Sequence, residues 1–293
     1  MTSGIFWLAS YPKSGNTWLR SYIFAIQSNV ANHTDELDIN QLSTGSIASS
    51  RAWLAAGSGL ELNLHPASDL ESYRAETYRY LHNNLSTMAY HKIHDANINI
   101  ATGGLLCPAD ACLGALYVVR NPFDVAISFA NHLGVSIDES IEIMAKADYS
   151  LAKKQHKLTS QVKQYMGSWG EHVNSWLDSE LPLLWVRYED MQQDALHCFT
   201  AISEFLHLPM DEASVLKALE LCHFDKLSTQ EKQYGFVEKP IKSKAFFRKG
   251  KVGDWTEVLT PQQVDQIIND HYESMLRLGY IDTNRELTAL CFP

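Results

Sequence analysis

Apolar segments of strand length alternate along this chain with segments that have a helical pattern. The strand-like segments are rich in apolar, aromatic and β-branched residues and lie at residues 4–10, 87–92, 113–119 and 183–187. Helical patterns follow three of them, at residues 17–28, 122–133 and 191–206. This alternation predicts an α/β fold with a mostly parallel central sheet flanked by helices, in which ligands bind at the carboxyl ends of the strands.

Two stretches, at about residues 31–86 and 135–159, have a less regular pattern and predict excursions over the sheet edge that form an acceptor pocket. Residues 159–181 have the spacing of one long amphipathic helix, with Trp169 and Trp176 in the core. A length of 293 residues suits one large α/β domain, so we interpret residues 1–293 as a single domain.

The composition is that of a folded protein, with 45% apolar and 20% charged residues. No apolar run approaches the roughly 18 residues that a membrane span needs, and the apolar stretch near the N-terminus is too short for a signal peptide core. The five cysteines are scattered without a CxxC pair, so neither a disulfide framework nor a zinc site is favoured. A cytoplasmic location fits these features best.

The formal net charge of −10 argues against nucleic acid or a membrane surface as a partner, because both are recognised through basic patches. Residues 239–251 nevertheless carry basic charges alone. These basic residues are Lys239, Lys242, Lys244, Arg248, Lys249 and Lys251. The segment is either a solvated basic loop or a surface that attracts a small polyanionic ligand.

Residues 11–18 (YPKSGNTW) lie between the first predicted strand and the helix that follows it. Their backbone N–H groups and the helix N-terminus can converge on a phosphate, and Lys13 adds a positive charge. Ser14, Asn16 and Thr17 add hydrogen-bonding side chains. The segment is not a Walker A loop, because Lys13 precedes its one glycine, and on the residues alone a phosphate loop and a tight turn both stay open.

Residues 11–19 (YPKSGNTWL) resemble the 5′-phosphosulfate loop of the cytosolic sulfotransferases that use 3′-phosphoadenosine 5′-phosphosulfate (PAPS). Three further segments resemble motifs of that family in the same order. Residues 92–94 (KIH) resemble its catalytic strand end, residues 120–128 (RNPFDVAIS) its 3′-phosphate motif, and residues 248–255 (RKGKVGDW) its C-terminal cofactor motif. Together the four motifs span residues 5–255.

The resemblance implies the P-loop-like sulfotransferase fold and transfer of a sulfonate group from PAPS to a hydroxyl of a small-molecule acceptor. The residues that it implies for binding the cofactor are Lys13, Ser14, Gly15, Asn16, Thr17, Trp18, Arg120, Ser128, Tyr188, Phe224, Arg248, Lys249 and Gly250. Arginine offers a planar fork of donors suited to a phosphate, and glycine lets the backbone approach a ligand closely.

Some of these residues have a structural interpretation as well. Trp18, Tyr188 and Phe224 fall where the family contacts adenine, and core packing is the alternative for each of them. Arg120 could instead form a surface ion pair with Asp124, four residues further along the predicted helix.

The resemblance and the side-chain chemistry assign roles in the transfer. His94 is the expected general base, since an imidazole of near-neutral pKa can accept the proton of a hydroxyl. Lys13 is expected to stabilise charge on the leaving oxygen, Lys92 to hold the sulfonate oxygens, and Ser128 to contact Lys13. No metal is expected, because lysines and backbone donors can take the place of magnesium. A metal pair of His91 and His94 lacks a recognisable third ligand.

Two other classes of function stay open: a nucleotide-dependent kinase, which the missing Gly-Lys-Ser/Thr triplet disfavours, and a non-catalytic nucleotide-binding protein. Apolar and aromatic residues between positions 30 and 90 favour a small apolar alcohol as the acceptor. Asp95 and Ala96 follow His94 where the family commonly has Leu or Pro, which leaves the acceptor choice open. Residues 256–265 do not match the family's dimer motif, so no oligomeric state is predicted.

Overall fold

A computed structural model describes residues 2–32, 37–42, 44–59, 73–100, 104–152, 160–240, 243 and 245–292. The chain divides into two compact units. Unit 1 consists of residues 1–11, 44–117 and 146–185, and unit 2 consists of residues 12–43, 118–145 and 186–293. The interpretation of residues 1–293 as a single domain stays a prediction.

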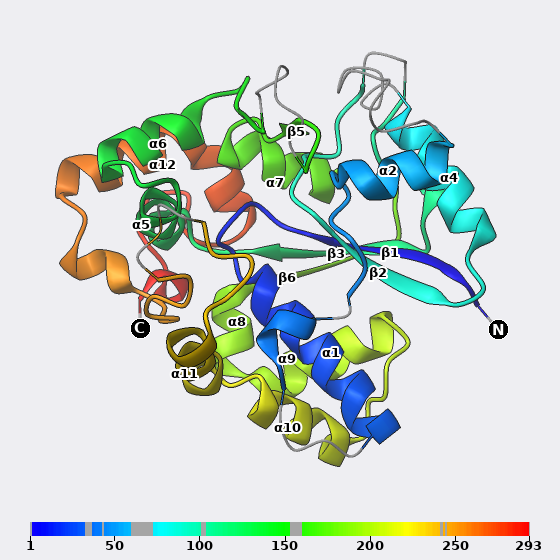
Figure 1. Cartoon of the computed structure of the whole chain (residues 1–293). Helices are drawn as coiled ribbons and strands as arrows, with labels where there is room; N and C mark the ends of the chain where they lie inside the picture. The colour runs from blue at the N-terminus through cyan, green and yellow to red at the C-terminus, as the bar shows by residue number, and fades with distance from the viewer. Residues whose placement is uncertain are drawn as a thin grey trace. The chain divides into compact units, whose positions relative to one another are not determined.

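The strands of the main sheet have the order β2-β1-β3-β6 (Figure 1). They are β1 (Gly4–Ala9), β2 (Met88–Ile93), β3 (Gly114–Val119) and β6 (Leu183–Arg187), and the last residues of β3 and β6 belong to unit 2. β1 pairs in parallel with both β2 and β3. Every residue of β1 and β3 is buried, and such continuous apolar strands are typical of a parallel sheet. The predicted α/β class is confirmed.

One face of the sheet in unit 1 carries large aromatic side chains. The elements that accompany the sheet in this unit are α2 (Arg51–Ser58), α4 (Arg74–Asn84), η2 (Ala109–Ala111), β4 (Ser150–Leu151), β5 (Gln164–Tyr165) and α7 (Trp169–Leu177). Trp7, His91 and Tyr117 share one face because side chains alternate along parallel strands in register. Tyr78 of α4 packs against Trp7 with ring centroids 4.8 Å apart, and Trp176 of α7 stacks on Tyr117 at 6.2 Å.

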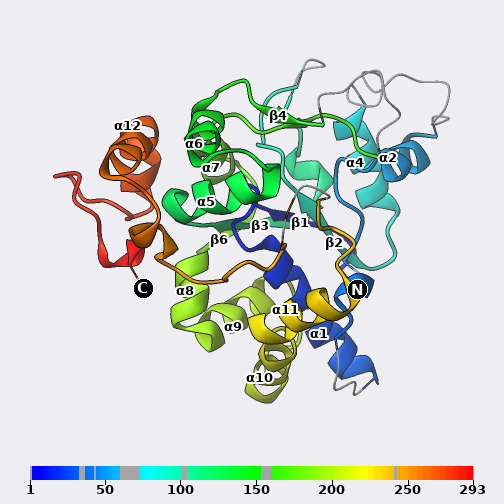
Figure 2. The same ribbon diagram turned by 60° about the vertical axis from the view of Figure 1, so that its left-hand side comes forward.

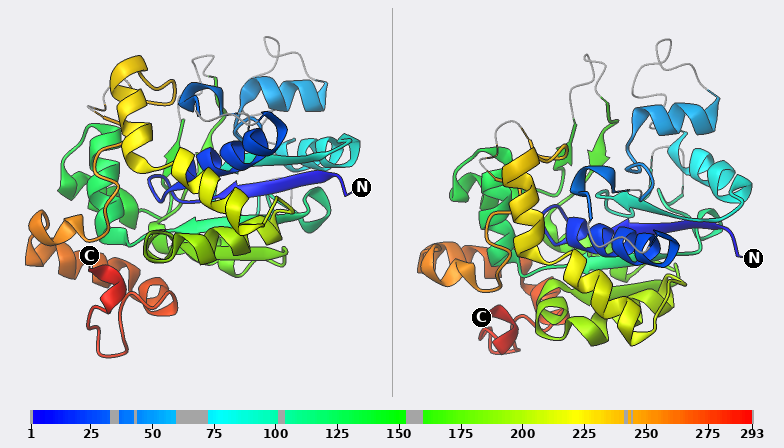
Figure 3. Two further views of the ribbon diagram at one scale, coloured as in Figure 1. Left: turned by 90° about the horizontal axis from the view of Figure 1, so that it is seen from below. Right: turned by 60° about the horizontal axis from the view of Figure 1, so that its bottom comes forward.

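Unit 2 is mainly helical. Its elements are α1 (Asn16–Asn32), η1 (Ile39–Gln41), α5 (Pro122–Leu133), α6 (Ile137–Ala145), α8 (Tyr188–Gln193), α9 (Ala195–Phe205), α10 (Glu212–Leu221), α11 (Phe224–Tyr234), η3 (Asp254–Glu257), α12 (Pro261–Arg277) and η4 (Ala289–Cys291). α5, α6 and α12 pack together (Figure 2), and α10 lies beside α1 and α9 (Figure 3). α5 begins where the Asn121 side chain accepts the N–H of Phe123 and Pro122 takes the first helical position.

The long helix predicted at residues 159–181 is wrong over its first half, because residues 164 and 165 form β5. The helix begins at Trp169, where Ser168 and Glu171 form a capping box that fixes the start. The prediction that Trp169 and Trp176 are core residues is confirmed, since both are fully buried.

The other helix predictions differ from the structure at their ends. The helix predicted at residues 191–206 is two helices, because the Asp194 side chain accepts the N–H of His197 and starts a second one. α1 continues to Asn32, four residues past the predicted end. Of the two irregular stretches, the second contains α6, and residues 60–72 and 153–159 of these stretches lie outside the described residues.

Candidate active site

The loop before α1 has the backbone conformation of an anion-binding turn. Lys13 has a φ of 72° and Gly15 a φ of 109°, and positive φ values that alternate with negative ones turn successive N–H groups toward one side. A side chain at position 15 would lie 2.7 Å from Cδ2 of Tyr188, so glycine is required there. The Lys13 ammonium lies 4.0 Å from the centre of the Phe246 ring.

Ser14 of this loop is fully buried, and its hydroxyl oxygen has no hydrogen-bond partner among the described residues. Asn16 and Thr17 follow in the first turn of α1, where backbone N–H groups have no partner within the helix. A buried hydroxyl without a partner costs free energy, so a ligand oxygen fits this position.

Arg120 lies at the end of β3 against the ring of Tyr188, with its guanidinium carbon 4.4 Å from the ring centroid. Its Nη2 donates to the carbonyl oxygen of Lys251 at 2.7 Å. The ion pair with Asp124 is present at 3.6 Å, but it is buried rather than on the surface, since the side chains are 10% and 1% exposed. Nε of Arg120 is buried and has no hydrogen-bond partner in the described part of the chain.

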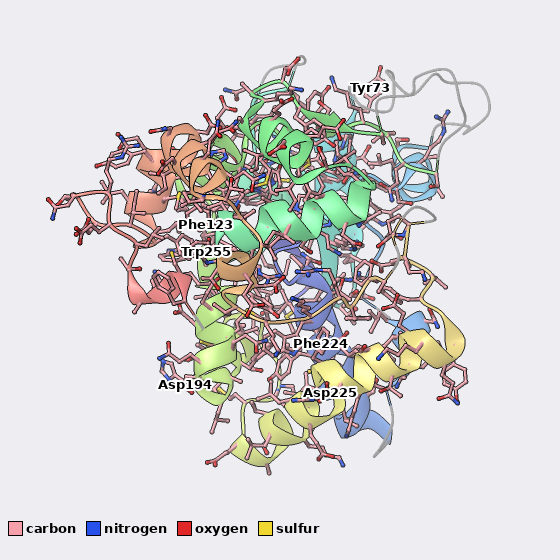
Figure 4. The ribbon with its side chains drawn as sticks, turned by 90° about the vertical axis from the view of Figure 1, so that its left-hand side faces the viewer. Tyr73, Phe123, Asp194, Phe224, Asp225 and Trp255 are labelled. Atoms are coloured by element: carbon pink, nitrogen blue, oxygen red, sulfur yellow. The ribbon has the colours of Figure 1, made fainter. Side chains whose placement is uncertain are left out.

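Asp124 ties α5 to the C-terminal cofactor motif. Its Oδ2 accepts the N–H of Gly253 at 2.9 Å, and its Oδ1 accepts the N–H of Trp255 at 3.1 Å. The ring of Trp255 packs on Phe123 with centroids 4.8 Å apart (Figure 4). Burial raises the pKa of Asp124 above its usual value, although Arg120 and the two N–H groups oppose the rise. The 3′-phosphate motif and the C-terminal cofactor motif therefore meet within unit 2.

Asp254 holds the two basic side chains of the C-terminal motif. Nη2 of Arg248 donates to Oδ2 of Asp254 at 2.5 Å, and Nζ of Lys249 donates to Oδ1. Burial acts to raise the pKa of Asp254, but the hydrogen bonds from Lys249 and Arg248 lower it overall. Nε of Arg248 is buried, and the residues that the structure describes offer it no acceptor.

Trp18, Tyr188 and Phe224, the predicted adenine contacts, all lie in unit 2. Trp18 is half-buried, with its ring 5.8 Å from that of Tyr188 and 5.1 Å from that of Phe199. Tyr188 donates its hydroxyl to the carbonyl oxygen of Gly250 at 3.0 Å. Phe224 is also half-buried, and a side chain at position 250 would come within 2.3 Å of its ring. The rings of Trp18 and Tyr188 pack on one another, and that of Phe224 packs on Phe247. Contact of these rings with adenine stays a prediction.

Ser128 and the basic segment at residues 239–251 also belong to unit 2. Ser128 lies half-buried on α5, and its contact with a lysine stays a prediction. Within the basic segment, Lys239 is 3.9 Å from Glu231, while Lys242 and Lys244 lie outside the described residues.

His94, the predicted base, lies in unit 1 directly after β2. Its Nδ1 is 2.8 Å from the carbonyl oxygen of Ser10. A carbonyl oxygen can only accept, so Nδ1 carries the proton of the neutral ring and Nε2 carries the lone pair. The carbonyl oxygen of His94 in turn accepts Nε2–H of His172 at 3.0 Å. Lys92, two residues earlier on β2, is half-buried.

His91 has a structural role that separates it from His94. It lies on the face of the sheet opposite to that of Lys92, its ring stacks on Trp53 at 4.3 Å, and its Nδ1 donates to the carbonyl oxygen of Ser46 at 2.9 Å. Burial lowers the pKa of His91. Within the described ranges, no group of three or more His, Cys, Asp and Glu residues is arranged to hold a metal ion.

Three carboxylates that sequence reasoning did not assign organise unit 2. Asp124 and Asp254 lie inside the two cofactor motifs, and this position in the sequence could have marked them as residues that hold the motifs. Glu189 is buried beside Tyr188 and accepts the N–H of Asn121 at 3.0 Å and the hydroxyl of Tyr280 at 2.8 Å. Burial raises the pKa of Glu189 to about 6.

Comparisons with known proteins identify related sequences and structures. Residues 112–279 match the family model described as the sulfotransferase domain. The chain is 28% identical over 269 residues to cytosolic sulfotransferase 10 of Arabidopsis thaliana, which covers 89% of this chain and 74% of the relative. It is 26% identical over 276 residues to flavonol 3-sulfotransferase of Flaveria bidentis, which covers 89% of this chain and 78% of the relative.

Solved structures share the fold at low sequence identity. Mouse sulfotransferase SULT7A1 complexed with PAP has a TM-score of 0.59 at 20% identity and covers 94% of this chain and 86% of that chain. Retinol dehydratase in complex with androsterone and PAP has a TM-score of 0.57 at 17% identity and covers 92% and 80%. Every helix in the described ranges is too short or too polar to span a membrane.

Proposed function

Because this chain belongs to the sulfotransferase domain family, we propose that it transfers a sulfonate group from PAPS to a hydroxyl of a small, apolar acceptor. The observation that carries the choice of donor is the set of buried hydrogen-bonding groups in unit 2. Oγ of Ser14, Nε of Arg120 and Nε of Arg248 each lack a partner among the described residues. Buried groups of this kind fit the phosphate and sulfonate oxygens of an anionic nucleotide.

The residues that would hold the nucleotide come from three segments of unit 2. The loop at residues 13–18 would bind the 5′-phosphosulfate through its N–H groups, and Arg120, Ser128 and Arg248 would bind the 3′-phosphate. The rings of Trp18, Tyr188 and Phe224 would contact the adenine. PAPS, when bound, supplies the sulfonate group and leaves as 3′-phosphoadenosine 5′-phosphate (PAP).

The side chains of the chain supply the proton transfer and the charge stabilisation. Nε2 of His94 carries the lone pair, so it would accept the proton of the acceptor hydroxyl. Lys13 would stabilise the negative charge that develops on the leaving oxygen, and Lys92 would orient the sulfonate oxygens. We propose that these groups act without a metal ion, and turnover in excess chelator tests that step.

The names of the compared proteins support an apolar acceptor. One relative is a flavonol 3-sulfotransferase, and retinol dehydratase is solved with androsterone. We therefore propose a small apolar alcohol or phenol as the acceptor, and relatives named as cytosolic sulfotransferases support a cytoplasmic location. A panel of hydroxylated compounds with labelled PAPS would identify the acceptor.

The first experiment is calorimetric titration of PAP into the wild type and into Arg120→Ala and Arg248→Ala. Each variant loses charge-assisted hydrogen bonds of about 1.5–3 kcal/mol, so we expect PAP to bind roughly 10- to 100-fold more weakly. Arg79→Ala is the matched control, because Arg79 is a partly exposed arginine of unit 1 paired with Asp110. Wild-type protein that prefers magnesium-ATP over PAP would reject the proposal in favour of a kinase.

A further inference from the structure

A fully buried ion pair lies beside the predicted base in unit 1. The guanidinium of Arg74 meets the carboxylate of Asp95 through two parallel hydrogen bonds of 2.8 Å, and both side chains are 0% exposed. Arg74 also donates to the hydroxyl of Tyr78 at 2.9 Å and to the carbonyl oxygen of Lys163 at 3.1 Å. The hydroxyl of Tyr78 in turn donates to the carbonyl oxygen of Ala48 at 2.9 Å.

Asp95 is fixed by its main chain as well as by its carboxylate. Its Oδ1 accepts the N–H of Tyr165 at 2.8 Å, and its carbonyl oxygen accepts Nε1–H of Trp176 at 3.0 Å. The next N–H group, that of Ala96, donates to the carbonyl oxygen of Tyr165 at 2.7 Å. These bonds join the segment after β2 to β5 and α7, and they leave the peptide that follows His94 little freedom to rotate.

His172 holds the other side of the same peptide. Its Nε2–H donates to the carbonyl oxygen of His94, so its Nδ1 accepts the hydroxyl of Tyr117 at 3.0 Å. Burial lowers the pKa of His172 to about 4, which keeps the ring neutral and both hydrogen bonds in place near pH 7. The ring of Tyr11 packs edge-on against it at 5.3 Å.

We propose that Arg74, Asp95 and His172 are positioning residues that fix the main chain at His94 and Asp95, and thereby hold the His94 ring with its proton on Nδ1. The inference rests on the proposed role of His94 as the base. When Nδ1 of the His94 ring donates to the carbonyl oxygen of Ser10, the lone pair stays on Nε2. A His94 ring that moves away from this oxygen no longer favours the Nδ1–H tautomer. A buried ion pair gains little stability over an apolar pair of similar size, so fixed geometry is what this pair supplies.

The test is the double substitution Arg74→Met with Asp95→Asn. It removes both charges together, so no unpaired charge is buried, and the asparagine oxygen still accepts the N–H of Tyr165. We expect the Nε2–H tautomer of His94 to appear in two-bond ¹H–¹⁵N spectra, with the His94 signals assigned by their loss in His94→Gln. We also expect kcat to fall about 10- to 100-fold, because small misplacements of a reacting group cost that much. The affinity for PAP should not change.

Arg79→Met with Asp110→Asn is the matched control, because it removes a partly exposed ion pair between Arg79, on the same helix α4 as Arg74, and Asp110 of η2. A second pair of variants keeps the test decisive where the double variant does not fold. His172→Leu removes the donor to the carbonyl oxygen of His94, whereas His172→Gln retains an N–H donor. We expect the leucine variant to shift the tautomer and lower kcat, and the glutamine variant to restore both in large part.

Wild-type tautomer and wild-type kcat in the folded double variant, or equal effects of His172→Leu and His172→Gln, would overturn the proposal. The tautomer spectrum distinguishes failure of this positioning proposal from failure of the proposed role of His94 as the base. If His94→Ala retained full turnover, the base would be another group, yet the spectrum would still report whether the Arg74 and Asp95 pair orients the ring.

Discussion

Arg74 of unit 1 and Arg120 of unit 2 are both buried arginines, but their surroundings differ. Arg74 meets both oxygens of Asp95 and donates further to the hydroxyl of Tyr78. Arg120 shares the carboxylate of Asp124 with two backbone N–H groups and keeps a buried Nε for which the described residues offer no acceptor.

The difference between the two arginines indicates how the proposed proton transfer and the proposed nucleotide binding each depend on the fold. In unit 1 the contacts of the His94 ring and main chain come from the chain itself, so the proposed base needs no ligand to hold it in place. In unit 2 the buried donors of Ser14, Arg120 and Arg248 carry a desolvation cost that a bound anion relieves. We therefore expect substitutions at the base to change the rate, and substitutions around the orphan donors to change nucleotide affinity.

His94→Ala should have the largest effect on the rate, and it tests most directly the difference between unit 1 and unit 2. Loss of a general base costs about 10²- to 10⁴-fold in rate, so kcat should fall by that factor while PAP binds as in the wild type. Rate assays under saturating PAPS and calorimetry with PAP measure the two quantities. His197→Ala on α9 serves as the control, because His197 is an exposed histidine outside the site. A kcat within threefold of the wild type would remove His94 from the mechanism.

Gly250→Ala should have the next largest effect, and on affinity rather than rate. A Cβ at this position lies 2.3 Å from Cδ2 of Phe224, so the ring or the loop must shift, and both belong to the proposed nucleotide site. Overpacking of this kind costs about 1–3 kcal/mol, which corresponds to PAP binding roughly 5- to 150-fold more weakly.

Gly59→Ala is the matched control for backbone strain, because Gly59 has a φ of 71° and no described atom lies within 4 Å of a Cβ built there. It should lower the free energy of unfolding and leave PAP affinity unchanged. Equal losses of PAP affinity in Gly59→Ala and Gly250→Ala would show that strain, rather than contact with Phe224, is responsible.

Glu189→Gln should have the smallest effect, and this effect is on the pH dependence of stability. Unlike the orphan donors, Glu189 is a buried group of unit 2 that has hydrogen-bond partners. Burial raises the pKa of Glu189 from 4.5 to about 6, so the folded state holds its proton more tightly than the unfolded state. The stability from this protonated carboxyl is present below about pH 4.5 and is lost as the pH rises through about 6.

The free energy of unfolding of the wild type, relative to Glu189→Gln, should therefore fall by roughly 2 kcal/mol between pH 4 and pH 7. Urea unfolding of both proteins across that range measures the difference. A difference that stays constant with pH would mean that the pKa of Glu189 is the same in the folded and unfolded states, and that burial does not raise it.

Much of the fold could be predicted, because buried parallel strands and their following helices have a strong periodic signal. Strands β1 and β3 are uninterrupted apolar runs, and α5 begins at the proline that the sequence marked. The helix predicted at residues 159–181 failed because a periodic pattern gives no account of a local cap, and Ser168 with Glu171 restarts the chain there. Asp194 divides another predicted helix for the same reason.

The candidate site could be proposed from the sequence where its residues lie in contiguous motifs. Lys13, Arg120 and Arg248 each stand in a segment with a recognisable order of residues. The Arg74 and Asp95 pair could not be foreseen, because its members lie 21 residues apart in segments with no shared pattern. The tautomer of His94 depends on the carbonyl oxygen of Ser10, 84 residues earlier, and a contact at that distance is set by strand pairing rather than by local sequence.

The hydrogen bonds between Asp124 and the C-terminal motif also affect how the chain can fold while it is being synthesised. The two N–H donors, Gly253 and Trp255, follow Asp124 by 129 and 131 residues. At a translation speed of about 5–20 residues per second, roughly 6 to 26 seconds pass between the synthesis of Asp124 and that of these two donors. During that interval Asp124 cannot join α5 to the C-terminal motif, so this part of unit 2 can complete its folding only once translation has passed residue 255.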